Sequence, residues 1–61
     1  MSVSITLEEY LRLVEDSLIQ NAGLSYDRAK ELLQIESSEI QKAWESEKPA
    51  EDLAEEIASR H

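Results

Sequence analysis

The sequence predicts an all-α fold, a small bundle of three to four short helices in a single domain of residues 1–61. Glycine and proline occur once each, and the helix formers leucine, alanine and glutamate are abundant. No segment alternates apolar and polar residues for long, as a half-buried strand would. Apolar residues instead recur every three or four positions, which indicates helices with one buried face. The helices are expected at about 6–22, 25–36, 38–47 and 49–60.

The first helix has the clearest start and end signals. Thr6 and Glu9 have the spacing of a capping box, in which the Thr6 side chain accepts a hydrogen bond from the Glu9 amide. Gly23 follows the helix where a residue with positive φ commonly ends it. Leu13 and Ile19 lie outside the buried stripe, so they are either isolated exposed residues or contacts with a later helix or a second subunit of an oligomer. The stripe itself comprises Leu7, Tyr10, Leu11, Val14, Leu18 and Ala22.

Residues 32–44 decide how the middle of the chain folds. A continuous helix over 26–47 keeps its apolar residues in phase but places Glu36 among them, where an unpaired carboxylate is costly. A break near Glu36 lets Ser38 cap a new helix and turns Ile35 inward. The break is the favoured interpretation. The continuous helix is the alternative, and it would make a partner subunit nearly obligatory because too little core would remain.

The last helix is expected to be strongly amphipathic. Pro49 lacks an amide hydrogen and suits the first helical turn. Its apolar stripe comprises Ala50, Leu53, Ala54, Ile57 and Ala58, and acidic residues occupy the opposite arc. The largest apolar side chains of the chain, Tyr10, Tyr26 and Trp44, are expected to anchor the core, with an interface contact as the alternative for Trp44.

The charge of the chain narrows the choice of partners. Fourteen acidic and six basic residues give a net charge of −8, which disfavours direct binding to nucleic acid and to anionic membranes. Residues 36–61 carry net −5 and residues 1–35 carry net −3. The sequence contains no apolar stretch of roughly 18 residues and no signal peptide in its first five residues. A cytoplasmic location is therefore the default expectation.

The residues that catalysis or cofactor binding requires are scarce. Cysteine is absent and His61 is the one histidine, so neither an enzyme nor a cofactor is predicted. The carboxylates of the last helix share one side, but the sequence has no calcium-loop pattern, and hard cations want about six oxygens in a defined cage. No metal site is predicted.

Residues 29–44 loosely resemble the helix-turn-helix unit of many small bacterial and phage regulators. The resemblance implies a recognition helix that presents Ser38, Glu39, Gln41, Lys42, Glu45 and Ser46 to DNA. The segment lacks the glycine that is usual in the turn, and the glutamates of this helix oppose contact with phosphates. DNA binding is therefore the least favoured function.

The sequence favours a small acidic, non-enzymatic interaction module or regulator that binds a basic protein partner, since an acidic surface steers encounter with basic groups. One alternative is an inhibitor that mimics nucleic acid. Another is a structural subunit of a helical homo-oligomer, such as a homodimer with Leu13 and Ile19 at the contact. The candidate partner-binding residues are Glu45, Glu47, Glu51, Asp52, Glu55 and Glu56.

Overall fold

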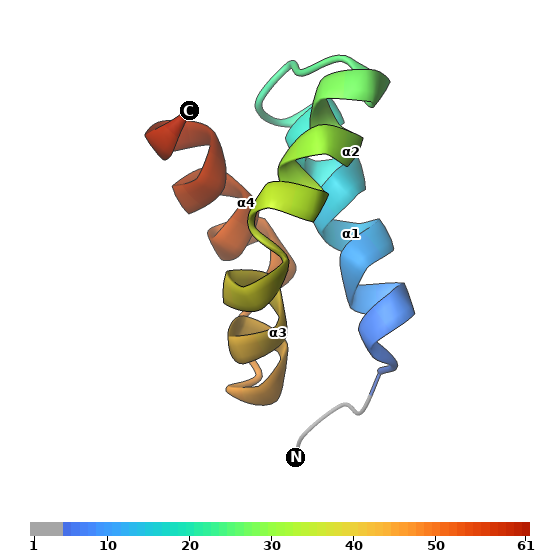
Figure 1. The fold of residues 1–61 in the computed structure, drawn as a ribbon, viewed down its shortest axis with the longest axis vertical. Helices are drawn as coiled ribbons and strands as arrows, with labels where there is room; N and C mark the ends of the chain where they lie inside the picture. The colour runs from blue at the N-terminus through green and yellow to red at the C-terminus, as the bar shows by residue number, and fades with distance from the viewer. Residues whose placement is uncertain (1–4) are drawn as a thin grey trace.

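The computed structural model describes residues 5–61, which form four α-helices and no strand (Figure 1). The prediction of a small all-α bundle is confirmed, and no predicted helix end differs from the observed one by more than two residues. The prediction that the first five residues contain no signal peptide concerns mostly residues 1–4, which lie outside the described range. The helices are α1 (Leu7–Gln20), α2 (Tyr26–Ile35), α3 (Ser37–Glu45) and α4 (Ala50–Arg60).

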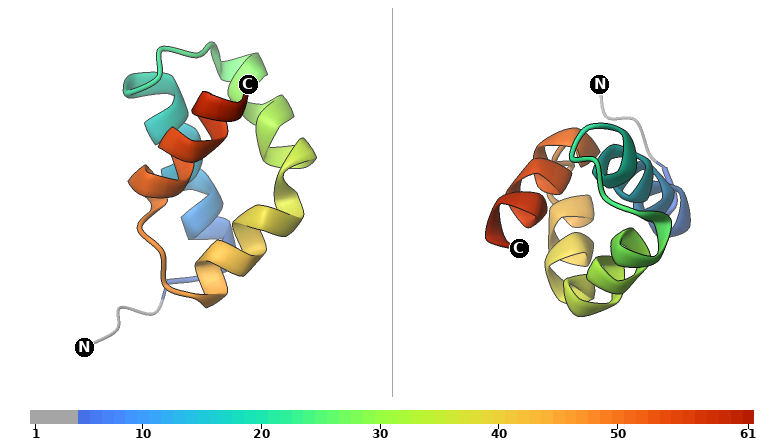
Figure 2. Two further views of the ribbon diagram at one scale, coloured as in Figure 1. Left: turned by 90° about the vertical axis from the view of Figure 1, so that its left-hand side faces the viewer. Right: turned by 90° about the horizontal axis from the view of Figure 1, so that it is seen from above.

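The helices surround a single core. Figure 2 shows α2 and α3 as the two arms of an arc, with α4 returning across α1. The most extensive contact between helices is that of α1 with α4. All four helices contribute buried apolar side chains: Tyr10, Val14, Leu18, Ala29, Leu32, Ile40, Ala43, Leu53, Ala54 and Ile57. The predicted stripes of α1 and α4 are thus largely confirmed. Ala22 is exposed, because α1 ends at Gln20, before the stripe reaches it.

The ends of α1 and the start of α2 follow the predicted signals. The Thr6 hydroxyl accepts a hydrogen bond from the Glu9 amide at 3.1 Å, and the Ser25 hydroxyl accepts one from the Arg28 amide at 3.2 Å. Gly23 has a φ of 73°, in the left-handed region that favours glycine. The chain can therefore turn within a few residues and bring α2 back along α1.

The predicted break in the middle of the chain is confirmed, but its details differ from the prediction. Glu36 alone separates α2 from α3, and it serves as the N-cap of α3 without a side-chain capping bond. Ser38 therefore does not cap the new helix. Ile35 is 59% exposed, whereas the Glu36 side chain is only 15% exposed. The prediction that a break turns Ile35 inward is wrong, because α2 continues through Ile35 and keeps it in the outward phase.

The α2–α3 pair resembles a helix-turn-helix unit only in its two consecutive helices. Such units usually join their helices by a turn of about three to four residues. Here hydrogen bonds of helical spacing continue on both sides of the junction. The Glu36 amide donates to the Leu32 carbonyl, and the Ile40 amide donates to the Glu36 carbonyl, both at 2.9 Å. The pair is therefore closer to one sharply bent helix.

The three aromatic residues have different surroundings. Tyr10 is buried, and its hydroxyl donates to the Lys48 carbonyl at 2.7 Å. Trp44 is half-buried against the core, and its indole nitrogen donates to the Ile5 carbonyl at 2.8 Å. Tyr26 is 56% exposed, so the prediction that it anchors the core is wrong. It is the first residue of α2, and helical side chains lean toward the N-terminus, which takes its ring past the end of the helix.

A turn with an unusual backbone joins α3 to α4. The Lys48 amide donates to the Ala43 carbonyl at 2.9 Å, and the Glu47 amide donates to the Trp44 carbonyl at 3.1 Å. These two bonds form a Schellman motif, whose left-handed position is normally glycine. Glu47 occupies that position with a φ of 61°. The side chain makes this conformation costly, and Pro49 then prevents α3 from continuing.

Replacing Glu47 by glycine should stabilise the protein. The left-handed conformation costs a residue with a side chain about 1–2 kcal/mol, and the larger entropy that glycine loses on folding offsets part of the gain. We expect E47G to raise the free energy of unfolding by about 0.5–1 kcal/mol in urea titrations. The matched control is E45G, which removes the same charge within α3. E45G should lower the free energy of unfolding by about 1 kcal/mol. If E47G lowered it by the same amount, the left-handed conformation of Glu47 would be contradicted.

The hydrogen bond from Tyr10 to Lys48 should contribute measurably to stability. The bond is partly buried and joins α1 to the α3–α4 turn. Removing one such bond typically costs about 1 kcal/mol, so Y10F should lower the free energy of unfolding by about that amount. Y26F removes the hydroxyl of an exposed tyrosine and should change stability by less than about 0.5 kcal/mol. Equal effects of the two substitutions on urea unfolding would argue against the bond.

Candidate functional site

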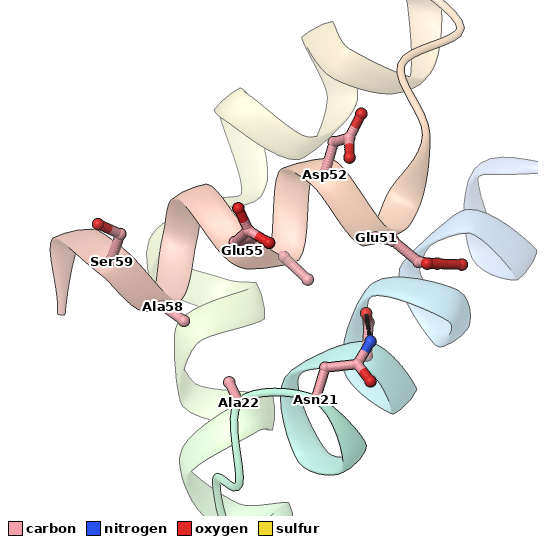
Figure 3. A pocket seen from close by; sticks show the side chains of 9 residues that line it. Asn21, Ala22, Glu51, Asp52, Glu55, Ala58 and Ser59 are labelled. Atoms are coloured by element: carbon pink, nitrogen blue, oxygen red, sulfur yellow. Dashed lines mark hydrogen bonds between the residues drawn. The ribbon is translucent and has the colours of Figure 1, made fainter.

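A groove lies between the C-terminal part of α1 and the outer side of α4. Its volume is about 510 Å³, and three acidic residues of α4, Glu51, Asp52 and Glu55, are among its lining residues. Figure 3 shows the Asp52 side chain on the side of α4 away from Asn21 and Ala22. Small apolar side chains also line the groove, and Figure 3 shows Ala58 of α4 pointing toward Ala22, which follows α1. The groove therefore combines acidic groups with an apolar surface that leaves room for a side chain.

The α1 side of the groove is polar and fixed in position. Ser17 is 7% exposed, and its hydroxyl accepts a hydrogen bond from the Asn21 side-chain amide at 2.9 Å (Figure 3). Both residues line the groove. Neither residue is among those predicted from the sequence, although Ser17 lies three residues after Val14 and seven after Tyr10. That spacing places Ser17 on the buried face of α1, so the helical periodicity of the sequence could have identified it as a buried polar residue.

The structure brings together only part of the predicted partner-binding set. Glu51, Asp52 and Glu55 line the groove, and within residues 5–61 none of them forms an ion pair. Glu56 is beside them on α4 but pairs with Lys48. The other two predicted residues, Glu45 and Glu47, lie at the end of α3 and in the following turn, and neither lines the groove.

The two predicted oligomer contacts also differ in their surroundings. Ile19 is half-buried and packs against the core of its own chain. Leu13 is 46% exposed on α1. Of the pair, Leu13 therefore offers more apolar surface for contact with another molecule.

A second polar cluster joins the end of α4 to the α2–α3 junction. The Glu36 cluster consists of Glu36, Arg60 and His61. One Glu36 oxygen lies 2.8 Å from His61 Nε2, and the other lies 3.6 Å from an Arg60 nitrogen. The hydrogen bond with His61, and secondarily the positive charges of Arg60 and His61, lower the pKa of Glu36 below its ordinary 4.5, although partial burial opposes the shift. The cluster therefore explains how a carboxylate is tolerated beside the core.

The carboxylates of α4 also affect the ionisation of a core residue, Tyr10. Burial raises the pKa of the Tyr10 hydroxyl, and the negative charges of Asp52 and Glu56 raise it further. A phenolate beside these carboxylates would be a buried charge near charges of the same sign. The phenol therefore stays protonated and keeps its bond to the Lys48 carbonyl.

Neither a metal centre nor a membrane-spanning helix is found in the part of the chain that the structure describes. No three histidine, cysteine, aspartate or glutamate side chains of residues 5–61 are arranged to hold a metal ion. Among the same residues, no helix is both long enough and apolar enough to cross a bilayer.

Comparison of the chain with protein families, curated proteins and solved structures finds no match.

The Glu36 cluster should make stability depend on pH in the acid range. Because the folded state lowers the pKa of Glu36, its contribution is present above the unfolded value and is lost as the pH falls through the folded one. The unfolding midpoint in urea should therefore decline below pH 4.5, and E36Q should remove part of this decline. The control E31Q breaks an exposed pair with Arg28 and should leave the decline unchanged. Identical pH profiles for E36Q and the wild type would contradict the assignment.

Proposed function

We propose that the protein is a small, non-enzymatic interaction module that binds a basic protein partner at the groove between α1 and α4. The observation that supports this proposal is the set of carboxylates at the groove, Glu51, Asp52 and Glu55. All three are exposed and have no ion-pair partner within residues 5–61. Their negative charges lie within two turns of one helix, and this repulsion is relieved when a positive group binds.

The form of the groove favours arginine or lysine side chains as the bound groups. Both have an apolar stem that packs on apolar surface while the charged head stays in contact with polar groups. Ala22, Ala54 and Ala58 provide small apolar surfaces within the groove. Arginine can bond a carboxylate through two parallel hydrogen bonds, so we expect it to bind more strongly than lysine.

The net charge of −8 supports the same proposal at longer range. An acidic protein attracts a basic partner before contact, and this attraction weakens as salt screens the charges. Ion pairs formed on an open groove of this kind are exposed to solvent, so each contributes little to the binding free energy by itself. The proposed complex should therefore associate rapidly and be sensitive to salt.

The proposal can be tested with a short arginine-rich peptide and two charge-matched variants. E51Q/D52N/E55Q removes the groove carboxylates. E8Q/E9Q/E39Q removes three exposed carboxylates that do not line the groove. Glu51 and Asp52 are in the first turn of α4, and the control residues are likewise in the first turns of α1 and α3, so the loss of favourable helix-dipole interactions is similar.

Binding of the peptide should be measured by NMR titration at low salt. We expect shifts concentrated at groove residues such as Ser17, Asn21 and Ala58. The groove variant should weaken binding by about tenfold, since three exposed ion pairs together contribute roughly 0.6–3 kcal/mol. The control variant should weaken binding by less than about threefold through net charge alone. Equal weakening by both variants, or shifts spread over every acidic surface, would contradict the proposal.

A further inference from the structure

An exposed apolar side chain continues the α1 wall of the groove. Leu13 lies four residues before Ser17 and eight before Asn21, so the three side chains follow one another along the same side of α1. Ser17 and Asn21 line the groove, and Leu13 is 46% exposed. The α1 wall therefore extends one helical turn beyond Ser17, where it changes from polar to apolar.

The two helices that border the groove run from the same end of it to the other. At one end, the Tyr10 hydroxyl of α1 bonds the carbonyl of Lys48, just before α4. At the other end, Ala58 of α4 points toward Ala22, which follows α1 (Figure 3). Successive turns of α1 therefore lie opposite successive turns of α4.

Leu13 and Glu51 consequently lie at the same end of the groove. Leu13 comes three residues after Tyr10, and Glu51 comes three residues after Lys48. Figure 3 shows the Glu51 side chain on the α1 side of α4. Glu55 follows one turn later, about 6 Å further along the helix. This end of the groove thus offers an exposed apolar surface next to two carboxylates that are one helical turn apart.

We propose that the basic partner binds this groove as an amphipathic helix, with an apolar side chain over Leu13 and an arginine or lysine one turn along against Glu55; the inference rests on the proposed function. A helix satisfies its own backbone hydrogen bonds, so it can cover the groove without leaving amides or carbonyls unpaired. An extended segment gains its backbone bonds from a strand edge, and residues 5–61 contain no strand. The small side chains of Ala54 and Ala58 leave space for the helix.

The charge at this end of the groove distinguishes among apolar partners. Neither Glu51 nor Glu55 forms an ion pair within residues 5–61, so positive charge beside the apolar side chain strengthens its binding over Leu13. A second copy of the chain would bring a net charge of −8 to the same place, and repulsion between like charges opposes that contact. A basic amphipathic helix covers the apolar surface and compensates both carboxylates.

Two helical peptides of identical composition test this arrangement. In the facing peptide, one leucine lies midway between two arginines, four residues from each, so all three share one side of the helix in either direction. In the displaced peptide, the leucine is moved by two residues, which places it on the opposite side. The remaining positions are alanine and glutamine in both peptides. The peptides therefore have the same charge and the same helix propensity.

Two protein variants separate the contribution of Leu13 from that of the carboxylates. L13A and I35A each remove an exposed aliphatic side chain and leave the net charge unchanged. Ile35 ends α2 and does not line the groove, so I35A is the matched control.

Binding should be followed by NMR titration at low salt. We expect the facing peptide to bind the wild type about fivefold more tightly than the displaced peptide, because its leucine and Leu13 shield each other from water. L13A should abolish this difference, and I35A should preserve it. The Cα chemical shifts of the facing peptide should move toward helical values on binding.

The outcomes separate this inference from the proposed function. If both peptides bind equally, or the bound peptide is not helical, while E51Q/D52N/E55Q still weakens binding, the helix and the role of Leu13 are overturned and the proposed function stands. If that variant binds both peptides as the wild type does, the proposed function fails and the inference fails with it. A wild-type dimer in sedimentation that L13A dissociates would also overturn the inference, because a second copy would then cover Leu13.

Discussion

The packing of α4 across α1 is the interaction on which the rest of the structure depends. Tyr10, Val14 and Leu18 of α1 and Leu53, Ala54 and Ile57 of α4 supply six of the ten buried apolar residues. Each large side chain buried in this way contributes about 1.5–3 kcal/mol relative to its exposed state. A chain of this size buries only about 60% of its unfolded surface, so there is little other apolar contact to replace these residues. The groove lies along the edge of the same contact.

Side-chain hydrogen bonds then fix the positions of the segments around this contact. Tyr10 bonds the carbonyl of Lys48 just before α4, and Trp44 bonds the carbonyl of Ile5 just before α1. Both bonds connect residues that are nearly 40 positions apart. The aromatic rings bury apolar area, and their polar atoms satisfy carbonyls that a helix end or a turn leaves without a partner. One end of α4 is thereby tied to α1, and the Glu36 cluster ties the other end to the α2–α3 junction.

The sequence predicts those parts of the fold that depend on local spacing. The Thr6 and Ser25 caps, the positive φ of Gly23 and the buried stripe of α4 follow from residues within a turn or two of each other. The inward position of Glu36 does not follow from local spacing. The cost of placing its carboxylate near the core is offset by Arg60 and His61, which are distant in the sequence. A helical pattern identifies Glu36 as unfavourable in a core, but it cannot identify the cations that face it.

The candidate site was predictable to a similar extent. The acidic arc of α4 is evident in the sequence, and Glu51, Asp52 and Glu55 do line a groove. The sequence does not show that Glu56 is paired with Lys48, or that Asn21 forms the opposite wall. Both facts depend on the crossing of α4 over α1, which is set by packing between helices. Tyr26 stays outside the core because it is the first residue of α2, whereas its residue type alone suggests burial.

The core forms within a single chain, without the second subunit that a continuous middle helix would require. The most direct test is an isotope-filtered NOE experiment on a mixture of labelled and unlabelled protein. The ring protons of Tyr10 should show contacts with Lys48 and with the methyl groups of Leu53 and Ile57 within one molecule. The same contacts should be absent between labelled and unlabelled chains. Contacts found only between chains would show that α4 packs on a second copy, and they would contradict the account.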